Sequence, residues 1–144
     1  IMVEIPAIAL LAEQVASEVD FASIGTNDLC QYLCAADRMN PDAAPYYQSF
    51  SPAMLRTLAL IAAGFVRAGR PLSVCGELGG DPRAAVLLLG MGVRKLSMAP
   101  ANLASVKAAV CSISRTEAVR LTEKALRLST QAEVLAFLKG NGVG

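Results

Sequence analysis

Residues 21–28 read FASIGTND, an apolar segment that stops at a glycine and continues directly into a threonine, an amide and a carboxylate. Three other short apolar segments carry functional groups at or just after their ends, namely IMVEIP at 1–6, SVCGE at 73–77 and KLSM at 95–98. Helical patterns separate the four segments, and alternating strands and helices favour parallel pairing with right-handed crossovers. Polar groups at the carboxyl ends of such strands are typical of the active site of a β/α barrel.

The predicted fold class is α/β, with four parallel strands. A closed barrel needs eight strands and about 250 residues, whereas this chain has 144 residues. An open sheet of four strands would leave two bare edges. We therefore expect the carboxyl-terminal half of a (β/α)8 TIM-type barrel with a helical tail. Because the chain begins inside an apolar strand, we also expect it to be part of a longer protein.

The amino-acid composition limits the classes of protein to which this chain can belong. Hydrophobic residues make up 54% of the chain, charged residues 17%, and the net charge is +1. This balance indicates elements buried on both faces and points to neither nucleic acid nor an anionic membrane surface as a partner. The apolar runs are shorter than the roughly 18 residues of a membrane-spanning helix, and no signal peptide is recognisable. Four cysteines without CxxC spacing and no histidine argue against a zinc site and favour a cytoplasmic protein with reduced thiols.

The elements expected from the pattern alternate along the chain. The strands are predicted at 1–5, 21–24, 72–75 and 93–98, and the helices at 7–19, 28–35, 51–68, 83–89, 100–112, 114–128 and 130–138. The segment 37–51 is predicted to be a long loop, and loops of that length in a compact domain are usually functional. Residues 140–144 are expected to be disordered. Residues 1–112 form the second half of the barrel in this prediction, and residues 113–144 form the helical tail of the same domain.

Two carboxylates and an amide are candidate ligands at the strand ends. Glu4 ends an apolar strand, so it either binds a metal or acts in catalysis, or it accepts backbone N–H groups or pairs with an arginine. Asn27 and Asp28 can bind a hard cation and a phosphoryl oxygen together, or Thr26 or Asn27 only caps the following helix. Magnesium is the predicted metal, because it favours one or two carboxylates plus a substrate phosphate.

Arg38 and Cys75 complete the candidate site. Arg38 lies in the long loop, where its guanidinium either grips phosphate bidentately or is simply solvated. Cys75 ends a strand before a glycine-rich turn, so it is a candidate nucleophile or proton donor, although many cysteines are inert packing residues. The other three cysteines are expected on helices as packing residues, and packing is also the favoured interpretation of Tyr46 and Tyr47.

Five motifs together resemble the phosphoenolpyruvate-utilising enzymes. They are IMVEIP (1–6), FASIGTNDL (21–29), AADRMN (35–40), VCGELGGDP (74–82) and LGMGVRKLSM (89–98). Within that family the chain is most similar to enzyme I of the phosphotransferase system, the phosphoenolpyruvate–protein phosphotransferase. Its leucine-rich segment after Asp81-Pro82 resembles the nitrogen-related form. The resemblance covers residues 1 to about 112, and the remainder is similar only in being helical.

The resemblance implies a dimeric β/α barrel that binds phosphoenolpyruvate and passes phosphate to a histidine on a separate swivelling domain, for onward transfer to a phosphocarrier protein. It implies that Glu4 and Asp28 bind Mg²⁺ and that Asn27 and Arg38 hold the phosphate. Cys75 would be the catalytic acid that protonates the enolate carbon to give pyruvate.

The chain departs from the family pattern in three ways. It contains no histidine, it lacks the first four strands with their phosphate-binding arginines, and it has Ser51 where many relatives have histidine. We therefore expect the isolated chain to be inactive. Pyruvate phosphate dikinase and phosphoenolpyruvate synthase, which share the barrel and motifs, remain an alternative. A second alternative is that the isolated segment acts only as a dimerisation module.

Overall fold

The computed structural model describes residues 1–144 and contains one four-stranded sheet, in the order β1-β2-β3-β4, with every neighbouring pair parallel. The strands are short: β1 (Met2–Val3), β2 (Ala22–Gly25), β3 (Leu72–Cys75) and β4 (Lys95–Leu96). Three of them lie within the predicted segments and β2 extends one residue beyond its segment, to Gly25, so the all-parallel α/β class and the half-barrel topology are confirmed.

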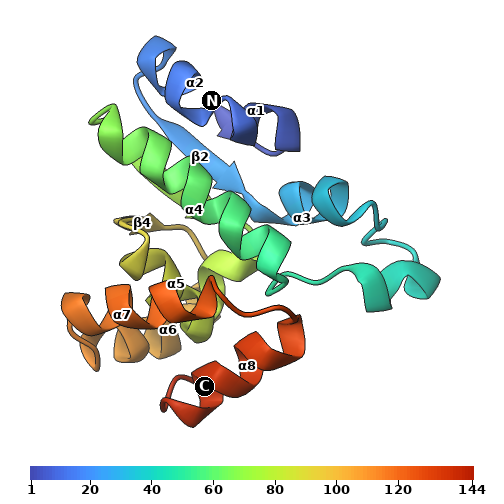
Figure 1. Cartoon of the computed structure of the whole chain (residues 1–144), viewed down its shortest axis with the longest axis vertical. Coiled ribbons are helices and arrows are strands. Elements are labelled where there is room, and N and C mark those ends of the chain that lie inside the picture. Colours follow the sequence, from blue (N-terminus) through green and yellow to red (C-terminus); the bar gives the residue numbers. More distant parts are fainter.

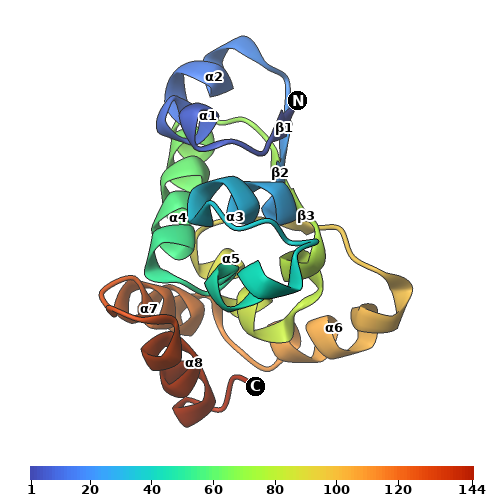
Figure 2. The same cartoon turned by 90° about the vertical axis from the view of Figure 1, so that its right-hand side faces the viewer.

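Helices connect the strands and follow them. They are α1 (Pro6–Leu10), α2 (Ala12–Glu18), α3 (Thr26–Cys34), α4 (Pro52–Arg67), α5 (Pro82–Gly90), α6 (Leu103–Cys111), α7 (Arg115–Ala125) and α8 (Gln131–Gly140). Figures 1 and 2 show α1, α2 and α4 together along one side of the strands. None of the helices combines the length and the apolar character that crossing a membrane requires.

The two faces of the sheet differ in burial. Val3, Ile24 and Val74 are fully buried and belong to the same apolar core as Leu58 and Phe65 of α4. Side chains alternate along a strand, so their neighbours Glu4, Ser23, Ser73 and Cys75 lie on the opposite face, where they are only half-buried. In a closed barrel this second face lines the interior.

The sequence pattern missed several local features. The predicted helix 7–19 is divided at Leu11, whose φ of −100° and ψ of 17° leave the helical region. The loop 37–51 contains a 3₁₀ helix, η1 (Pro41–Tyr46). The expectation of disorder at 140–144 is wrong, because α8 extends to Gly140 and Val143 is buried in the core.

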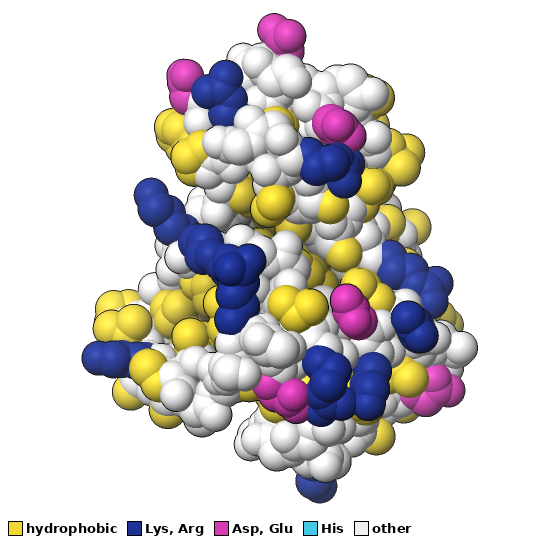
Figure 3. All heavy atoms as spheres, turned by 60° about the vertical axis from the view of Figure 1, so that its left-hand side comes forward, with side chains coloured by type: hydrophobic (Ala, Val, Ile, Leu, Met, Phe, Trp, Pro, Cys, Tyr) yellow, Lys and Arg dark blue, Asp and Glu magenta, His cyan; other side chains and the backbone are white.

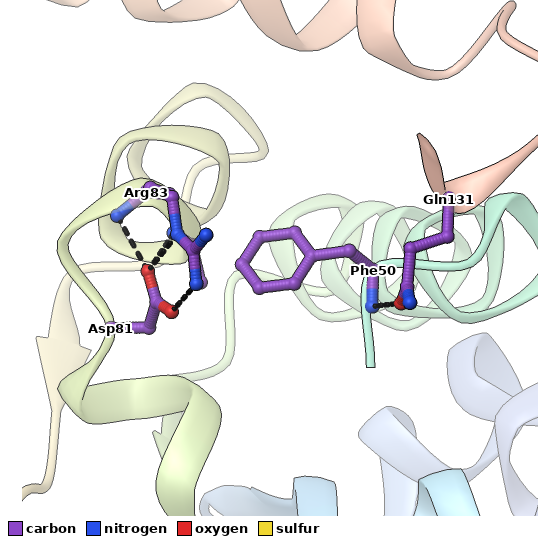
Figure 4. Close-up of polar contacts among 5 residues, drawn as sticks. Phe50, Asp81, Arg83 and Gln131 are labelled. Atoms are coloured by element: carbon purple, nitrogen blue, oxygen red, sulfur yellow. Dashed lines mark hydrogen bonds and ion pairs between the residues drawn. The ribbon is translucent and has the colours of Figure 1, made fainter. Parts of the chain in front are cut away.

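The last helix is tied to the long loop by a polar contact. The backbone N–H of Phe50 donates to the side-chain oxygen of Gln131 at 2.9 Å. The Phe50 ring faces the guanidinium of Arg83, with 4.9 Å between the guanidinium carbon and the ring centroid, and Arg83 pairs with Asp81 (Figure 4). Asp81 also accepts from the first backbone N–H groups of α5. The end of the loop therefore lies between the start of α5 and the start of α8.

Close packing of α2 on α4 requires a glycine at position 64. A Cβ atom there would lie 2.9 Å from the Glu13 backbone nitrogen and 3.1 Å from the Ala12 carbonyl carbon. We predict that Gly64→Ala lowers the free energy of unfolding by about 1–3 kcal/mol, because rigid backbone has to move. Urea denaturation measures this change.

Gly140→Ala is the matched control, because a Cβ there meets no atom within 4 Å. Alanine also has the higher helix propensity, so this variant should be as stable as the parent protein or slightly more stable. Equal stability of the two variants would contradict the close-packing explanation.

Candidate functional site

The register of the sheet brings two of the predicted site residues, Glu4 and Cys75, to one level with Gly25 between them. Gly25 pairs with Cys75, and Val3 pairs with Ile24. Continuing the second pairing by one residue places Glu4 beside Gly25. Glu4, Gly25 and Cys75 therefore form a row across the carboxyl ends of β1, β2 and β3, on the less buried face of the sheet.

Gly25 makes room for the Glu4 side chain within this row. A Cβ atom on Gly25 would lie 2.6 Å from Glu4 Cγ and 2.7 Å from Glu4 Oε1. The carboxylate thus leans over β2 toward the neighbouring strands. It forms no ion pair or hydrogen bond within the chain, so the interpretation that Glu4 pairs with an arginine or accepts backbone N–H groups is wrong. A half-buried carboxylate without a protein partner favours a ligand role.

The Cys75 thiol is half-buried and donates to the Ile24 carbonyl, with 3.4 Å between sulfur and oxygen. The Cys75 carbonyl in turn accepts from the Thr26 hydroxyl at 2.8 Å. These two bonds hold the end of β3 against the start of α3. Thr26 is buried, and it does not cap the helix, because α3 begins directly after Gly25 without a side-chain cap.

Asn27 is oriented by the turn that follows Cys75. Its side-chain oxygen accepts from the Glu77 backbone N–H at 3.1 Å, so the amide nitrogen keeps its two donors for other partners. Asn27 also lines a cavity of about 340 Å³ together with Gly76, Ser97 and Asn102. The capping interpretation of Asn27 is therefore wrong as well, and its donor is available at a cavity beside the strand ends.

Gly76 is the position where the turn tolerates only a glycine. Its φ is +91°, and a Cβ atom there would lie 2.5 Å from the Thr26 hydroxyl and 2.9 Å from the Asn27 side-chain oxygen. A side chain would therefore strain the backbone and also displace the two residues that the turn positions.

Arg38 lies near Asp28, with 3.7 Å between the guanidinium nitrogen Nη2 and the carboxylate oxygen Oδ1. Both side chains are a little over a third exposed, so this pair contributes little to stability. Gln31 positions the loop by accepting from the Arg38 backbone N–H at 3.2 Å. Arg38 is therefore held beside the start of α3 with its guanidinium accessible.

Tyr47 does more than pack, which corrects the interpretation drawn from the sequence. Its hydroxyl donates to the Asn27 carbonyl at 3.1 Å. Burial, together with the neighbouring Cys30 and Glu77, raises the pKa of Tyr47 to about 12. The phenol is therefore protonated at neutral pH and holds the long loop against α3.

A comparison with known protein families matches residues 1–115 to the PEP-utilising enzymes, specifically to their PEP-binding domain, where PEP is phosphoenolpyruvate. This chain belongs to that family. The match includes all four strands and every candidate site residue described above.

Proteins named phosphoenolpyruvate-protein phosphotransferase are close relatives of this PEP-binding domain. Those of Bacillus sp. (strain S) and Geobacillus stearothermophilus are each 45% identical over 138 residues, which is 96% of this chain and 24% of the relative. The phosphoenolpyruvate-dependent phosphotransferase system protein of Escherichia coli (strain K12) is 41% identical over 148 residues, covering 100% of this chain and 20% of the relative. The chain thus spans at most about a quarter of these relatives.

The residues of the PEP-binding domain fit a magnesium ion by their chemistry. Glu4 lies directly after β1 and Asp28 lies in the first turn of α3, and no cluster of three or more His, Cys, Asp or Glu side chains occurs in the chain. Zinc or calcium usually takes a fuller set of protein ligands. Magnesium retains several waters and needs only one or two carboxylates with a substrate phosphate.

Sequence reasoning missed three positioning residues of this domain, namely Gly25, Thr26 and Tyr47. Gly25 accommodates Glu4, and the other two hold neighbouring segments through hydrogen bonds to carbonyls. A glycine directly before a polar cluster is a usable signal for the first. The partners of Thr26 and Tyr47 are 49 and 20 residues away, so no local pattern reveals them.

The raised pKa values of two groups next to the site, Cys30 and Tyr47, predict how stability depends on pH. Burial and the neighbouring Cys34 raise the pKa of Cys30 from 9.0 to about 12. The pKa of Tyr47 is raised from 10.0 to about 12. A raised pKa means that the folded state favours the protonated form. This contribution is complete below pH 9 and is lost as the pH rises toward 12.

We therefore expect the free energy of unfolding, measured with urea, to fall from pH 8 to pH 11. The Tyr47→Phe variant should show a smaller fall, because one of the two titrating groups is gone. Tyr46→Phe, at an exposed position, is the control and should follow the parent protein. An identical pH profile for all three proteins would refute the assignment.

Proposed function

We propose that this chain supplies the magnesium- and phosphoenolpyruvate-binding strand ends of an enzyme I-type phosphoenolpyruvate–protein phosphotransferase. One observation carries the proposal: Glu4, Gly25 and Cys75 share a level on one face of the sheet, and Glu4 has no protein partner. The identity of 45% to proteins of that name supports it. The activity belongs to the intact protein, because the matched relatives are about four times longer than this chain.

The phosphate of the substrate is proposed to bind between the start of α3 and the long loop. The Asn27 amide offers donors at the cavity, and the Arg38 guanidinium offers a bidentate pair of donors with a fixed positive charge. Glu4 and Asp28 would hold Mg²⁺, which when bound neutralises the negative charge of the phosphate and carboxylate oxygens. The Asp28–Arg38 pair is loose enough to open for an anion.

The proposed reaction breaks the phosphorus–oxygen bond of phosphoenolpyruvate as a histidine nitrogen on another domain bonds to phosphorus. The bonding electron pair remains on the substrate oxygen, which gives the enolate of pyruvate. The Cys75 thiol then donates its proton to the enolate carbon C3, pyruvate forms, and the thiolate recovers a proton from water. Positioning and charge stabilisation account for most of the rate in such transfers.

The thiol of Cys75 suits this role in its present environment. Its sulfur lies at the carboxyl end of β3, on the face that carries Glu4, and donates to the Ile24 carbonyl. We further propose that the intact protein acts as a homodimer and passes its phosphate to a phosphocarrier protein. A nucleotide requirement of the intact protein would instead favour pyruvate phosphate dikinase or phosphoenolpyruvate synthase.

We predict that Glu4→Gln in the intact protein reduces magnesium-dependent phosphorylation by phosphoenolpyruvate at least 100-fold, because the amide lacks the charge that holds the cation. Labelled phosphoenolpyruvate and a phosphohistidine assay measure the effect. Glu18→Gln is the control, since Glu18 is exposed at the end of α2, and it should retain full activity. Full activity of the Glu4→Gln variant would contradict the proposal that Glu4 binds the metal.

For Cys75→Ala we expect the two steps to separate. Phosphoryl transfer to histidine should continue within about tenfold of the parent rate, while pyruvate release slows by about 10²–10⁴, the usual contribution of a positioned acid. Rapid-quench analysis of phosphoprotein and pyruvate in one turnover separates the steps. Cys111→Ala removes an exposed thiol and should change neither; an equal loss of both steps in Cys75→Ala would exclude the acid role.

A further inference from the structure

A second, smaller cavity lies at the opposite end of the sheet from the candidate site, where β3 and β4 begin. Its volume is about 140 Å³, and three cations line it, Arg70, Arg94 and Lys95. The cavity lining contains no acidic residue. Its other walls are formed by Ala62, Val66, Pro71, Leu72, Gly92 and Val93. A concentration of one charge in an apolar recess is unusual for a chain whose net charge is only +1.

None of these three cations has an acidic partner. The four ion pairs of the chain use Arg38, Arg67, Arg83 and Arg120. Arg94 donates only a long bond of 3.5 Å to the carbonyl of its neighbour Val93. Figure 3 shows a run of Lys and Arg side chains on the left-hand part of one face of the molecule, with no Asp or Glu side chain within it.

The carboxyl ends of two helices lie nearby, and their negative partial charges offset part of the positive charge of the cavity. The α4 helix ends at Arg67, beside Val66, and α5 ends at Gly90, just before Gly92. The carboxyl end of a helix carries roughly −0.5 of an elementary charge. Two such ends offset about one of the three positive charges, so a surplus of about two positive charges remains.

The size of the recess limits what can fill it. Its 140 Å³ corresponds to about four or five waters at roughly 30 Å³ each, which suits a tetrahedral oxyanion or a single phosphoryl group but is too small to enclose a whole nucleotide. The three cations are exposed to solvent, so their attraction for an anion is screened by salt. Gly92, with φ of +97°, forms the turn at the wall, and a Cβ there would lie 3.3 Å from Val66.

We propose that Arg70, Arg94 and Lys95 form a binding site for a small dianion of the phosphate class, either inorganic phosphate or the terminal phosphoryl group of a metabolite. The site is separate from the candidate active site, because it lies at the amino ends of the strands whose carboxyl ends carry Cys75 and Ser97. Its occupation would link the packing of α4 and α5 against the sheet to the level of free phosphate.

The test is a titration of the 144-residue chain followed by amide nuclear magnetic resonance. Sodium phosphate and sodium sulfate are added at constant ionic strength, with sodium chloride as the monoanion reference. The amide signals of Gly92 and Val93 should shift saturably with both dianions and should not respond to chloride. Glucose 6-phosphate, compared with inorganic phosphate, tells whether a terminal phosphoryl group is accepted.

Variants separate this site from other cations. Arg94→Gln with Lys95→Gln should weaken phosphate binding at least tenfold, whereas Lys107→Gln with Lys139→Gln, an equal change of net charge at exposed helix positions, should leave it unchanged. Arg70→Gln, in the loop after α4, is the second pocket variant if the double variant loses its folded spectrum. Arg38→Gln should leave the Gly92 and Val93 shifts intact.

Three outcomes would overturn the proposal. They are shifts that grow linearly without saturation, equal weakening by the pocket and control variants, and dianion shifts confined to residues around Arg38. Each is independent of the proposed phosphotransferase activity, because no residue of this cavity takes part in the proposed reaction.

Discussion

The pairing of Gly25 with Cys75 is the constraint on which the candidate site depends. This register sets the end of β3 level with the end of β2, so that Thr26 reaches the Cys75 carbonyl and Asn27 reaches the Glu77 backbone. A slip by one residue would turn Cys75 into the core and Val74 toward the site. The buried Ile24 and Val74 prevent that slip, because exposing them would cost several kcal/mol.

Much of this fold is local enough to be predicted from the sequence. The four apolar segments, the glycines and the prolines at helix starts mark the strands and most helices, and α/β alternation leaves few topologies. The break at Leu11 is different, since no glycine or proline marks it. The two short helices on either side of it both pack on α4. Val143 shows the same limit at the other end, because a polar, glycine-rich tail is ordered by contacts with a distant core.

The candidate site was predictable in its members but not in its connections. The sequence pattern singles out Glu4, Asp28 and Cys75, because each is a charged or reactive residue at or just after the end of an apolar strand. What holds Asn27 and Arg38 in place is contributed by Tyr47, Glu77 and Gln31, through bonds to backbone or amide groups that have no sequence signature. Composition and spacing therefore reveal which groups meet, and only the packed structure reveals what fixes them.

The contact between Gln131 and Phe50 has a consequence for how the protein is made. A chain emerging from the ribosome begins to fold from its amino end, so β1 to β4 are available before α8 has been synthesised. The backbone N–H of Phe50 has no partner from α8 until residue 131 has emerged. Only the end of the loop at Phe50 would thus wait for residue 131, whereas Arg38 and Tyr47 are held by contacts to α3 that form earlier.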